Sequence, residues 1–268
     1  MQLTALDQIN AQYRQIYLQP HFDDAALSCG GAIGLQAATG NRVLVVTVFG
    51  GVPPAGFTPS NFARQTQEKM GLGLDAAEAV RRRREEDAAA AETLHADTLW
   101  LEYLDAVYRG TPAQYAAEDA LFGEVQAGDL TLDEELAALL LNIHERAPLA
   151  VIYAPLGVGH HVDHQLVCSA ADRLAQRRLN VKFYEDFPYV AHPGALEGRQ
   201  RELGISMEPE LVEVSGLLRT KEEAVAQYTS QVPQLFGSQE RMRQALREYS
   251  STLRRTYPGI AIERFWRW

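Results

Sequence analysis

The chain has 268 residues, of which 46% are hydrophobic and 22% charged, and its formal net charge is −10 at pH 7. This composition is ordinary for a soluble globular protein, and a chain of this length buries enough surface to fold without disulfides. The acidic excess argues against sequence-independent nucleic-acid binding, which depends on Lys and Arg side chains that neutralise phosphates. The one basic cluster, residues 81–84, runs directly into acidic residues 85–87, so we expect a solvated helix face there.

The cysteines and the first residues of the chain indicate its compartment. Cys29 and Cys168 are the only cysteines, which is too few for a disulfide framework. The N-terminal residues have no basic region followed by an apolar stretch, and no apolar run approaches the ~20 residues of a membrane-spanning helix. We therefore expect a cytoplasmic protein with no membrane span and no nucleic-acid partner.

Apolar runs alternate with helical patterns over the first two thirds of the chain. In chain order the patterns predict a strand at 14–19, a helix at 25–39, a strand at 42–49, a helix at 76–94, a strand at 98–101, a helix at 132–145, a strand at 150–154, a helix at 162–177 and a strand at 181–185. Strands that alternate with helices predict an α/β fold with a parallel sheet and right-handed crossovers. Without a clear linker or internal repeat, we expect residues 1–268 to form a single domain.

Two long segments show no regular pattern. Residues 50–75 carry several Gly and Pro residues, and residues 104–130 mix short helical patterns with Gly110, Thr111 and Pro112. Irregular segments of this length are uncommon in a compact domain unless they act as lids or binding loops. Residues 50–75 are therefore a candidate lid, although an inert loop would have the same composition.

Two short polar motifs each follow a predicted strand. Residues 20–24 read Pro-His-Phe-Asp-Asp and come after the first strand, and residues 159–164 read Gly-His-His-Val-Asp-His and come after the fourth. One interpretation of the first motif is a helix cap, because Asp is a favoured N-cap residue. In the second motif His161 and His164 are three residues apart at a helix start and share a face.

The two motifs together predict a metal site. Loops that follow parallel strands open on the same edge of the sheet, so His21, Asp24 and His164 can converge there. Two imidazoles and one carboxylate with an open position make up a catalytic zinc site, and the same set also suits iron(II). The motifs also hold an additional carboxylate and an additional imidazole, which are the groups that hydrolysis needs as base and acid.

At these residues the chain resembles the LmbE/PIG-L family of metal-dependent N-deacetylases. The family pattern, Ala/Pro-His-Pro-Asp-Asp followed later by His-x-Asp-His, is matched by PHFDD and HVDH, with Phe22 in place of the commoner Pro. The likeness extends over most of the chain through LSCGG, RREE at residues 83–86, LEYLDA, FYEDFPY, KEEAVAQYTSQ and the terminal ERFWR.

The resemblance implies a Rossmann-like, mostly parallel sheet flanked by helices and a role for each motif residue. Zinc, or another divalent metal such as Fe²⁺, would be held by His21, Asp24 and His164. Asp23 would be the general base, and His161, oriented by Asp163, would stabilise the oxyanion or protonate the departing amine. Arg83 and Asp105 would contact the sugar. The implied reaction is the removal of acetyl from an N-acetylglucosamine-type sugar or its conjugate, a small-molecule substrate.

Other interpretations remain at this point. One is a non-catalytic sugar- or metal-binding protein of the same fold, and another is a deacylase acting on a different amide. Residues 30–34 read Gly-Gly-Ala-Ile-Gly, which is not the Gly-x-Gly-x-x-Gly pattern of dinucleotide binding. His160 has no role in the resemblance, and we expect it to be exposed to solvent. The sequence leaves open whether the chain forms a homo-oligomer.

Overall fold

A single sheet runs through the centre of the protein in a computed structural model that describes residues 1–253 and 260–268. Within these residues the sheet has eight strands, ordered β1 (Gln2–Leu3), β4 (Asp97–Trp100), β3 (Arg42–Thr47), β2 (Tyr13–Gln19), β5 (Val151–Pro155), β6 (Val181–Tyr184), β8 (Ile262–Arg267) and β7 (Glu208–Glu213). All pairs are parallel except those made by β8, which runs antiparallel to both β6 and β7. The predicted α/β fold with a mostly parallel sheet is confirmed.

The central strands are apolar because both of their faces are covered. Residues 43–47 of β3 are all buried, and so are residues 16–19 of β2, the strand beside it. Between β2 and β5 the rings of Tyr17 and Tyr153 stack with centroids 4.2 Å apart. Strands of this kind have near-continuous hydrophobic sequences instead of alternating ones, which is why the sequence pattern identified them.

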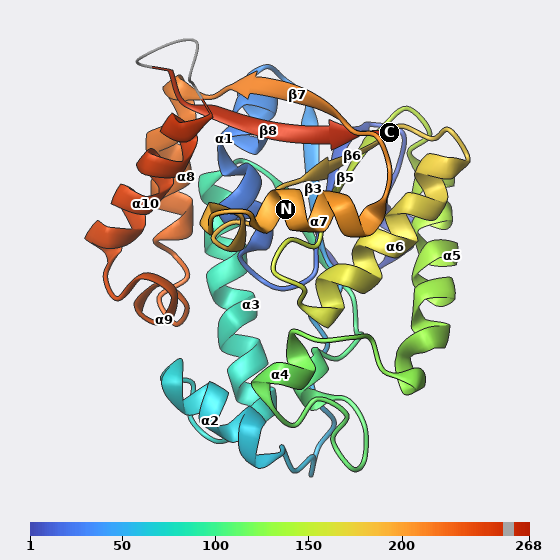
Figure 1. Ribbon diagram of the computed structural model, residues 1–268, viewed down its shortest axis with the longest axis vertical. Coiled ribbons are helices and arrows are strands. Elements are labelled where there is room, and N and C mark those ends of the chain that lie inside the picture. Colours follow the sequence, from blue (N-terminus) through green and yellow to red (C-terminus); the bar gives the residue numbers. More distant parts are fainter. Residues whose placement is uncertain (254–259) are drawn as a thin grey trace.

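Helices cover the sheet on two sides (Figure 1), with α1, α3 and α8 on one side of the strands and α5 and α6 on the other. The helices are α1 (Asp24–Ala38), α2 (Asn61–Lys69), α3 (Ala76–Thr93), α4 (Glu118–Leu121), α5 (Leu130–Arg146), α6 (Val162–Gln176), α7 (Ala195–Leu203), α8 (Leu218–Val225), α9 (Val232–Phe236) and α10 (Gln239–Thr252). Single 3₁₀ turns occupy Leu6–Gln8, Ala106–Tyr108, Ala127–Asp129, Tyr189–Ala191 and Ser215–Leu217. None of the described helices has the length and apolar character needed to cross a membrane.

Both segments that the sequence pattern left irregular contain short helices. Residues 50–75 include α2, whose first turn is capped by Ser60, the hydroxyl of which accepts the backbone N–H of Ala63. Residues 104–130 include α4 and two 3₁₀ turns. In Figure 1 α2 and α4 lie together at the bottom of the molecule, beyond the end of the sheet. The α2 helix has only nine residues in a segment that carries several Gly and Pro residues, which is why the sequence pattern did not predict it.

Candidate active site

The two motifs lie side by side at the point where the strand order reverses. From β2 the chain proceeds to β3 and β4 in one direction, whereas β5 on the other side of β2 leads to β6. Residues 20–24 follow β2 and residues 159–164 follow β5, so both loops leave the same edge of the sheet at neighbouring strands. Open α/β sheets bind their ligands at such a switch point.

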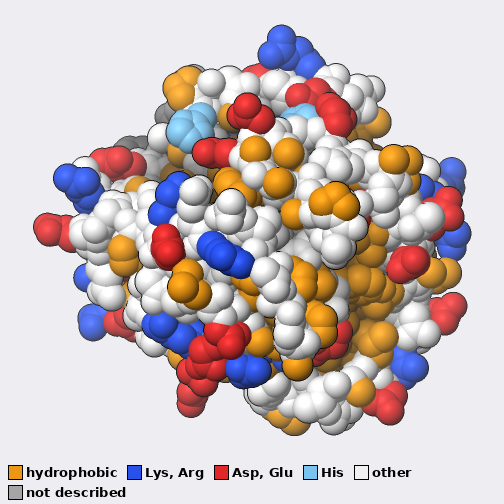
Figure 2. Space-filling view, turned by 90° about the horizontal axis from the view of Figure 1, so that it is seen from below, with side chains coloured by type: hydrophobic (Ala, Val, Ile, Leu, Met, Phe, Trp, Pro, Cys, Tyr) orange, Lys and Arg blue, Asp and Glu red, His pale blue; other side chains and the backbone are white. Residues whose placement is uncertain are grey.

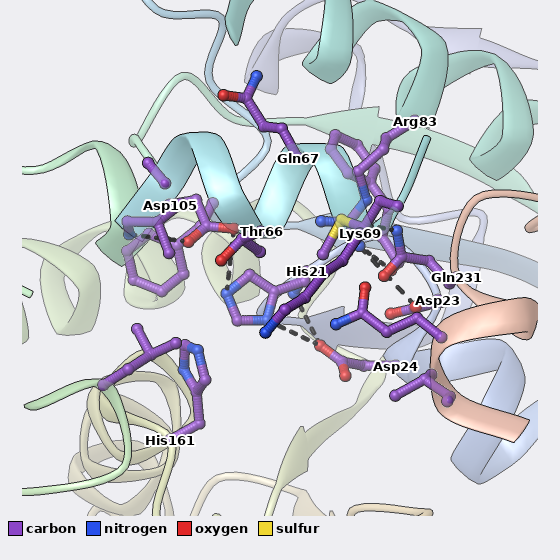
Figure 3. Close-up of a pocket in the computed structure, with 18 of the residues that line it drawn as sticks. His21, Asp23, Asp24, Thr66, Gln67, Lys69, Arg83, Asp105, His161 and Gln231 are labelled. Atoms are coloured by element: carbon purple, nitrogen blue, oxygen red, sulfur yellow. Dashed lines mark hydrogen bonds and ion pairs between the residues drawn. The ribbon is translucent and has the colours of Figure 1, made fainter. Parts of the chain in front are cut away.

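The three predicted metal ligands converge at this edge. Oδ2 of Asp24 lies 3.4 Å from Nε2 of His164 and 3.7 Å from Nδ1 of His21. The same oxygen accepts the backbone N–H of His21 at 2.7 Å, which fixes the Asp24 carboxylate in place. Figure 3 shows His21 lying between Asp24 and Asp105. Two imidazole nitrogens and a carboxylate oxygen in one cluster are a donor set that suits zinc.

His161 adds a third imidazole to this cluster. One ring nitrogen from each of His21, His161 and His164 lies within 4.8 Å of the other two. Nδ1 of His161 accepts the backbone N–H of Asp163 at 3.2 Å, so a neutral ring carries its proton on Nε2. Burial and the charge of His21 hold the pKa of His161 well below its ordinary value. His161 is therefore a neutral hydrogen-bond donor within the site.

The orienting carboxylate of His164 is one that the sequence analysis did not assign. Nδ1 of His164 lies 2.7 Å from Oδ1 of Asp186, and the other oxygen of Asp186 accepts the backbone N–H of Val158 at 2.8 Å. Burial lowers the pKa of His164, but Asp24 and Asp186 outweigh that effect and raise it to about 9. Asp186 belongs to the FYEDFPY segment and comes just after β6, so its position at a strand end was the available signal.

Asp163 orients a different histidine from the one expected. Its Oδ2 lies 2.9 Å from Nε2 of His21, whereas the expected carboxylate contact with His161 is not among the interactions of the described residues. Burial raises the pKa of Asp163, but the adjacent Arg109 and His21 lower it below its ordinary value. For His21, burial lowers the pKa, and Asp105, Asp163 and Asp24 raise it by more. An ionised Asp163 thus accepts the Nε2 proton of His21.

Asp23 precedes α1 in a conformation that side chains rarely adopt, with φ of 102°. Its side chain makes no cap hydrogen bond, so the helix-cap interpretation does not explain this residue. The residue is 6% exposed, and burial raises the pKa of its carboxyl to about 8, against the opposing charge of Arg83. Nη2 of Arg83 lies 3.8 Å from Oδ2 of Asp23. A backbone strained in this way is typical of functional sites.

The two residues expected to contact a sugar, Arg83 and Asp105, both line the cavity above this cluster. Arg83 donates to the backbone oxygen of Phe22 at 2.9 Å, and its guanidinium carbon lies 5.3 Å from the centroid of the Phe22 ring. Oδ2 of Asp105 lies 3.8 Å from Nε2 of His21, and its Oδ1 accepts the backbone N–H of Val107. His160, expected to be exposed, is half-buried and pairs with Glu202 at 3.0 Å.

The cavity has a volume of about 210 Å³ and a floor made of the two motifs. Its walls come from α2, from residues 105–122, from residues 187–189 and from the start of α9. They present Phe62, Thr66, Met70, Tyr108, Glu118, Phe122, Tyr189, Gln231 and Leu235. Figure 2, which views the molecule from the side of α2 and α4, shows hydrophobic side chains gathered on this face. The segments left irregular in the sequence therefore form most of the wall.

Comparison with known proteins identifies the family. Residues 16–175 match the PIG-L family, described as GlcNAc-PI de-N-acetylase. The chain belongs to the PIG-L family. The PIG-L chain is 33% identical over 239 residues to a 2'-N-acetylparomamine deacetylase of Niallia circulans, a match that spans 84% of the chain and 82% of that relative. A 2'-N-acetylparomamine deacetylase of Streptomyces fradiae is 27% identical over 224 residues, which are 81% of the chain and 73% of the relative.

Solved structures of similar fold include a deacetylase of the teicoplanin biosynthesis pathway. That structure shares 26% identity with the PIG-L chain at a TM-score of 0.80, over 94% of this chain and 96% of the other. A zinc-inhibited form of teicoplanin deacetylase matches at a TM-score of 0.78 with 25% identity, over 94% of this chain and 97% of the other. The predicted family and the prediction of a hydrolytic N-deacetylase are confirmed.

Proposed function

We propose that this PIG-L chain is a zinc-dependent hydrolase that removes acetyl from an N-acetylglucosamine-type sugar or its conjugate, with residues 1–268 acting as one deacetylase domain. The observation that carries the proposal is the position of the Asp24 carboxylate beside Asp23 at the floor of the cavity, where its Oδ2 lies 3.7 Å from Nδ1 of His21 and 3.4 Å from Nε2 of His164. The names of the relatives support it, since 2'-N-acetylparomamine and teicoplanin deacetylases remove acetyl groups. A zinc-inhibited form among the related structures supports a site that accepts zinc.

The metal site would be formed by His21, Asp24 and His164, whose outer partners are Asp163 and Asp186. A metal held there would supply Lewis-acid polarisation of the acyl carbonyl and an acidified water. Each histidine points one ring nitrogen at a carboxylate and turns the other toward the cluster, which is the arrangement that metal-binding histidines adopt. Fe²⁺ or another divalent cation would find the same donors.

Proton transfer is assigned to Asp23. Its ionised carboxylate would accept a proton from the water that attacks the acyl carbon, so that the new C–O bond forms as the O–H bond breaks. The same proton would then pass to the nitrogen as the C–N bond breaks, leaving acetate and a free amine. A carboxyl whose pKa is raised to about 8 by burial is suited to both halves of this transfer.

Charge that develops on the carbonyl oxygen would be met by His161. Its Nδ1 is occupied by the backbone N–H of Asp163, so the ring presents Nε2–H to the site. A fixed neutral donor in a buried site stabilises an oxyanion without reorganisation. A neutral ring whose Nδ1 accepts this N–H has no second proton to give, so the alternative role of His161 as the acid for the departing amine is not supported, and that proton is assigned to Asp23.

Substrate contacts are assigned to Arg83 and Asp105, which face the cavity from opposite sides of His21 (Figure 3). Guanidinium and carboxylate groups at these positions could bind the hydroxyl groups of an amino sugar. The aromatic and aliphatic wall residues, such as Phe122 and Tyr189, would pack against the apolar faces of the ring or of the acyl group.

The test is a metal-dependent assay of acetate and amine release. The protein is stripped with a chelator, reloaded with Zn²⁺ or Fe²⁺, and incubated with 2'-N-acetylparomamine, N-acetylglucosamine and longer N-acyl analogues. We expect no release by the stripped protein, release after metal is restored, and acetyl favoured over longer acyl groups. Sugar binding without release would support the non-catalytic alternative, and a preference for longer acyl groups would support a different deacylase.

A further inference from the structure

A buried arginine outside both motifs bridges two buried carboxylates next to the site. Nη1 of Arg109 lies 2.6 Å from Oδ1 of Asp163, and Nη2 lies 2.9 Å from Oδ2 of Asp129. Arg109 is 8% exposed, and its guanidinium carbon lies 5.0 Å from the ring centroid of Phe49 and 5.3 Å from that of Tyr115. The packed rings and the paired charges leave the guanidinium little freedom to move.

The two oxygens of Asp163 have different partners, which determines the orientation of the carboxylate. Oδ1 faces Arg109, and Oδ2 accepts from Nε2 of His21 at 2.9 Å and from the backbone N–H of Ala106 at 3.0 Å. Asp163 is fully buried, so no solvent competes for either oxygen. Arg109 thus holds one oxygen and leaves the other to His21.

The orientation of Asp163 in turn determines which nitrogen of His21 is free. When Nε2 donates its proton to Asp163, Nδ1 has an available lone pair, and this is the nitrogen that lies 3.7 Å from Oδ2 of Asp24. Partners of this kind fix the tautomer and ring orientation of metal-binding histidines. We propose that Arg109 is a positioning residue of the metal site, acting through Asp163 on His21; the inference rests on the proposed function, because that proposal supplies the metal.

A purely structural role for Arg109 would affect the stability of the protein and not the zinc affinity through Asp163. Arg109 also donates to the backbone oxygen of Leu104, so it stabilises the loop that carries Asp105. Loss of that contact would lower stability whether or not Asp163 moved. Zinc affinity separates the two roles, since the proposal requires the effect of Arg109 on the metal to pass through Asp163.

The experiment is a double-mutant cycle on zinc affinity, measured by competition with a chromophoric chelator. The proteins are the wild type, Arg109→Met, Asp163→Asn and the double variant. We expect each single variant to bind zinc about 10–100-fold more weakly, in line with other outer partners of metal ligands. We expect the double variant to bind zinc at most about 3-fold more weakly than the weaker-binding single variant, because the effects of two coupled residues do not add. Melting temperatures are recorded in parallel.

Arg42→Met is the matched control. Arg42 also pairs with a carboxylate, Asp97 at 2.9 Å, and stacks on an aromatic ring, Tyr13 at 4.4 Å, but it lies at the start of β3, at the opposite edge of the sheet. The Arg42→Met variant should have a lower melting temperature and a zinc affinity within about 2-fold of the wild type, as expected for a substitution distant from the metal.

Three results would overturn the proposal. Arg109→Met could bind zinc as tightly as the wild type, the losses of zinc affinity in the two single variants could multiply in the double variant, or Arg42→Met could lose as much zinc affinity as Arg109→Met. If Arg109→Met does not fold, Arg109→Lys carries the test, because lysine keeps the charge but cannot bridge two carboxylates with one fork. A folded Arg109→Lys protein with wild-type zinc affinity would also overturn it. A wild-type protein that binds no zinc would instead refute the proposed function.

Discussion

Nδ1 of His164 lies 2.7 Å from Oδ1 of Asp186, and both side chains are almost completely buried. This contact leaves Nε2 of His164 facing Asp24, at 3.4 Å from its Oδ2. The backbone N–H of Val158 holds the other oxygen of Asp186, so the loop after β5 and the end of β6 are joined through the carboxylate. His164 is therefore oriented from outside the proposed metal site before any metal binds.

The first prediction concerns Asp186. Asp186→Asn should weaken zinc binding about 10–100-fold, because an amide is a poorer acceptor for the Nδ1 proton and orients the ring less firmly. Asp172→Asn is the matched control, since Asp172 lies on the same helix as His164 and, within residues 1–253 and 260–268, its side chain accepts hydrogen bonds from Gln176 and Trp268. Zinc affinities by chelator competition are the measurement, and equal affinities in the two variants would contradict the assignment.

The second prediction separates Asp24 from His161, since both lie within reach of the two ligand histidines. Asp24→Ala should lose most of its bound zinc, because it removes the carboxylate of the proposed set. His161→Ala should keep its zinc and lose about 10²–10³-fold in kcat, the usual effect of removing an oxyanion donor. Metal content by elemental analysis and the rate of acetate release distinguish a metal ligand from an oxyanion donor. A His161→Ala protein without zinc would indicate a site with three histidine ligands.

The third prediction concerns the pH dependence of Asp23. The carboxyl must be ionised to act as a base, burial raises its pKa to about 8, and Arg83 acts in the opposite direction. Removing the guanidinium in Arg83→Met should therefore raise the pKa further and move the acidic limb of the kcat profile to higher pH. Arg84→Met is the control, since Arg84 pairs with Glu102 and Gly50 instead. An unmoved limb in Arg83→Met would exclude this coupling.

The fourth prediction links metal binding to stability. In the metal-free protein the pKa of His164 is raised from 6.5 to about 9, so its contribution to stability is present below pH 6.5 and lost as pH rises through about 9. The carboxyl of Asp23, raised from 3.8 to about 8, has the same sign and loses its contribution as pH rises between those values. Bound metal would replace the proton of the ligand His164, and its positive charge would disfavour the proton on the neighbouring Asp23. The melting-temperature increase on adding zinc should thus be larger near about pH 8.5 than near about pH 6.

His164→Ala tests the source of that pH dependence. Without the imidazole, zinc should give little stabilisation at either pH, and the metal-free protein should lose less stability as pH rises. The same increase in melting temperature at both pH values in the wild type would show that these groups do not exchange protons for metal.

The central fold could be predicted because its strands are buried on both faces. A continuous apolar run such as residues 43–46 is typical of a strand in the middle of a parallel sheet. Since parallel strands end at one edge, the convergence of His21, Asp24 and His164 followed from two loop positions and a topology rule. The strands β7 and β8 were missed, because the charged edge strand β7 (EPELVE) contains a proline and neither strand follows the parallel alternation.

The outer partners of the site could not be predicted from local patterns. Asp163 lies between His161 and His164 in the chain, yet its carboxylate faces His21, because the start of α6 turns that side chain toward the loop after β2. Arg109 reaches the site from a segment without any motif, and Asp186 reaches it from FYEDFPY, a segment of the resemblance that gave Asp186 no role. Such contacts depend on how distant segments pack, and a single sequence carries no signal for them beyond a charged residue near a strand end or in a loop.

The measurement that tests the central claim most directly is zinc content and acetate release of Asp23→Asn, determined on the same preparation. The account predicts that this variant keeps its metal, because Asp23 is not a ligand, and loses about 10²–10⁴-fold in kcat, because the base is gone. Asp24→Asn serves as the comparison that should lose metal. Acetate release at the wild-type rate by zinc-loaded Asp23→Asn would contradict the account.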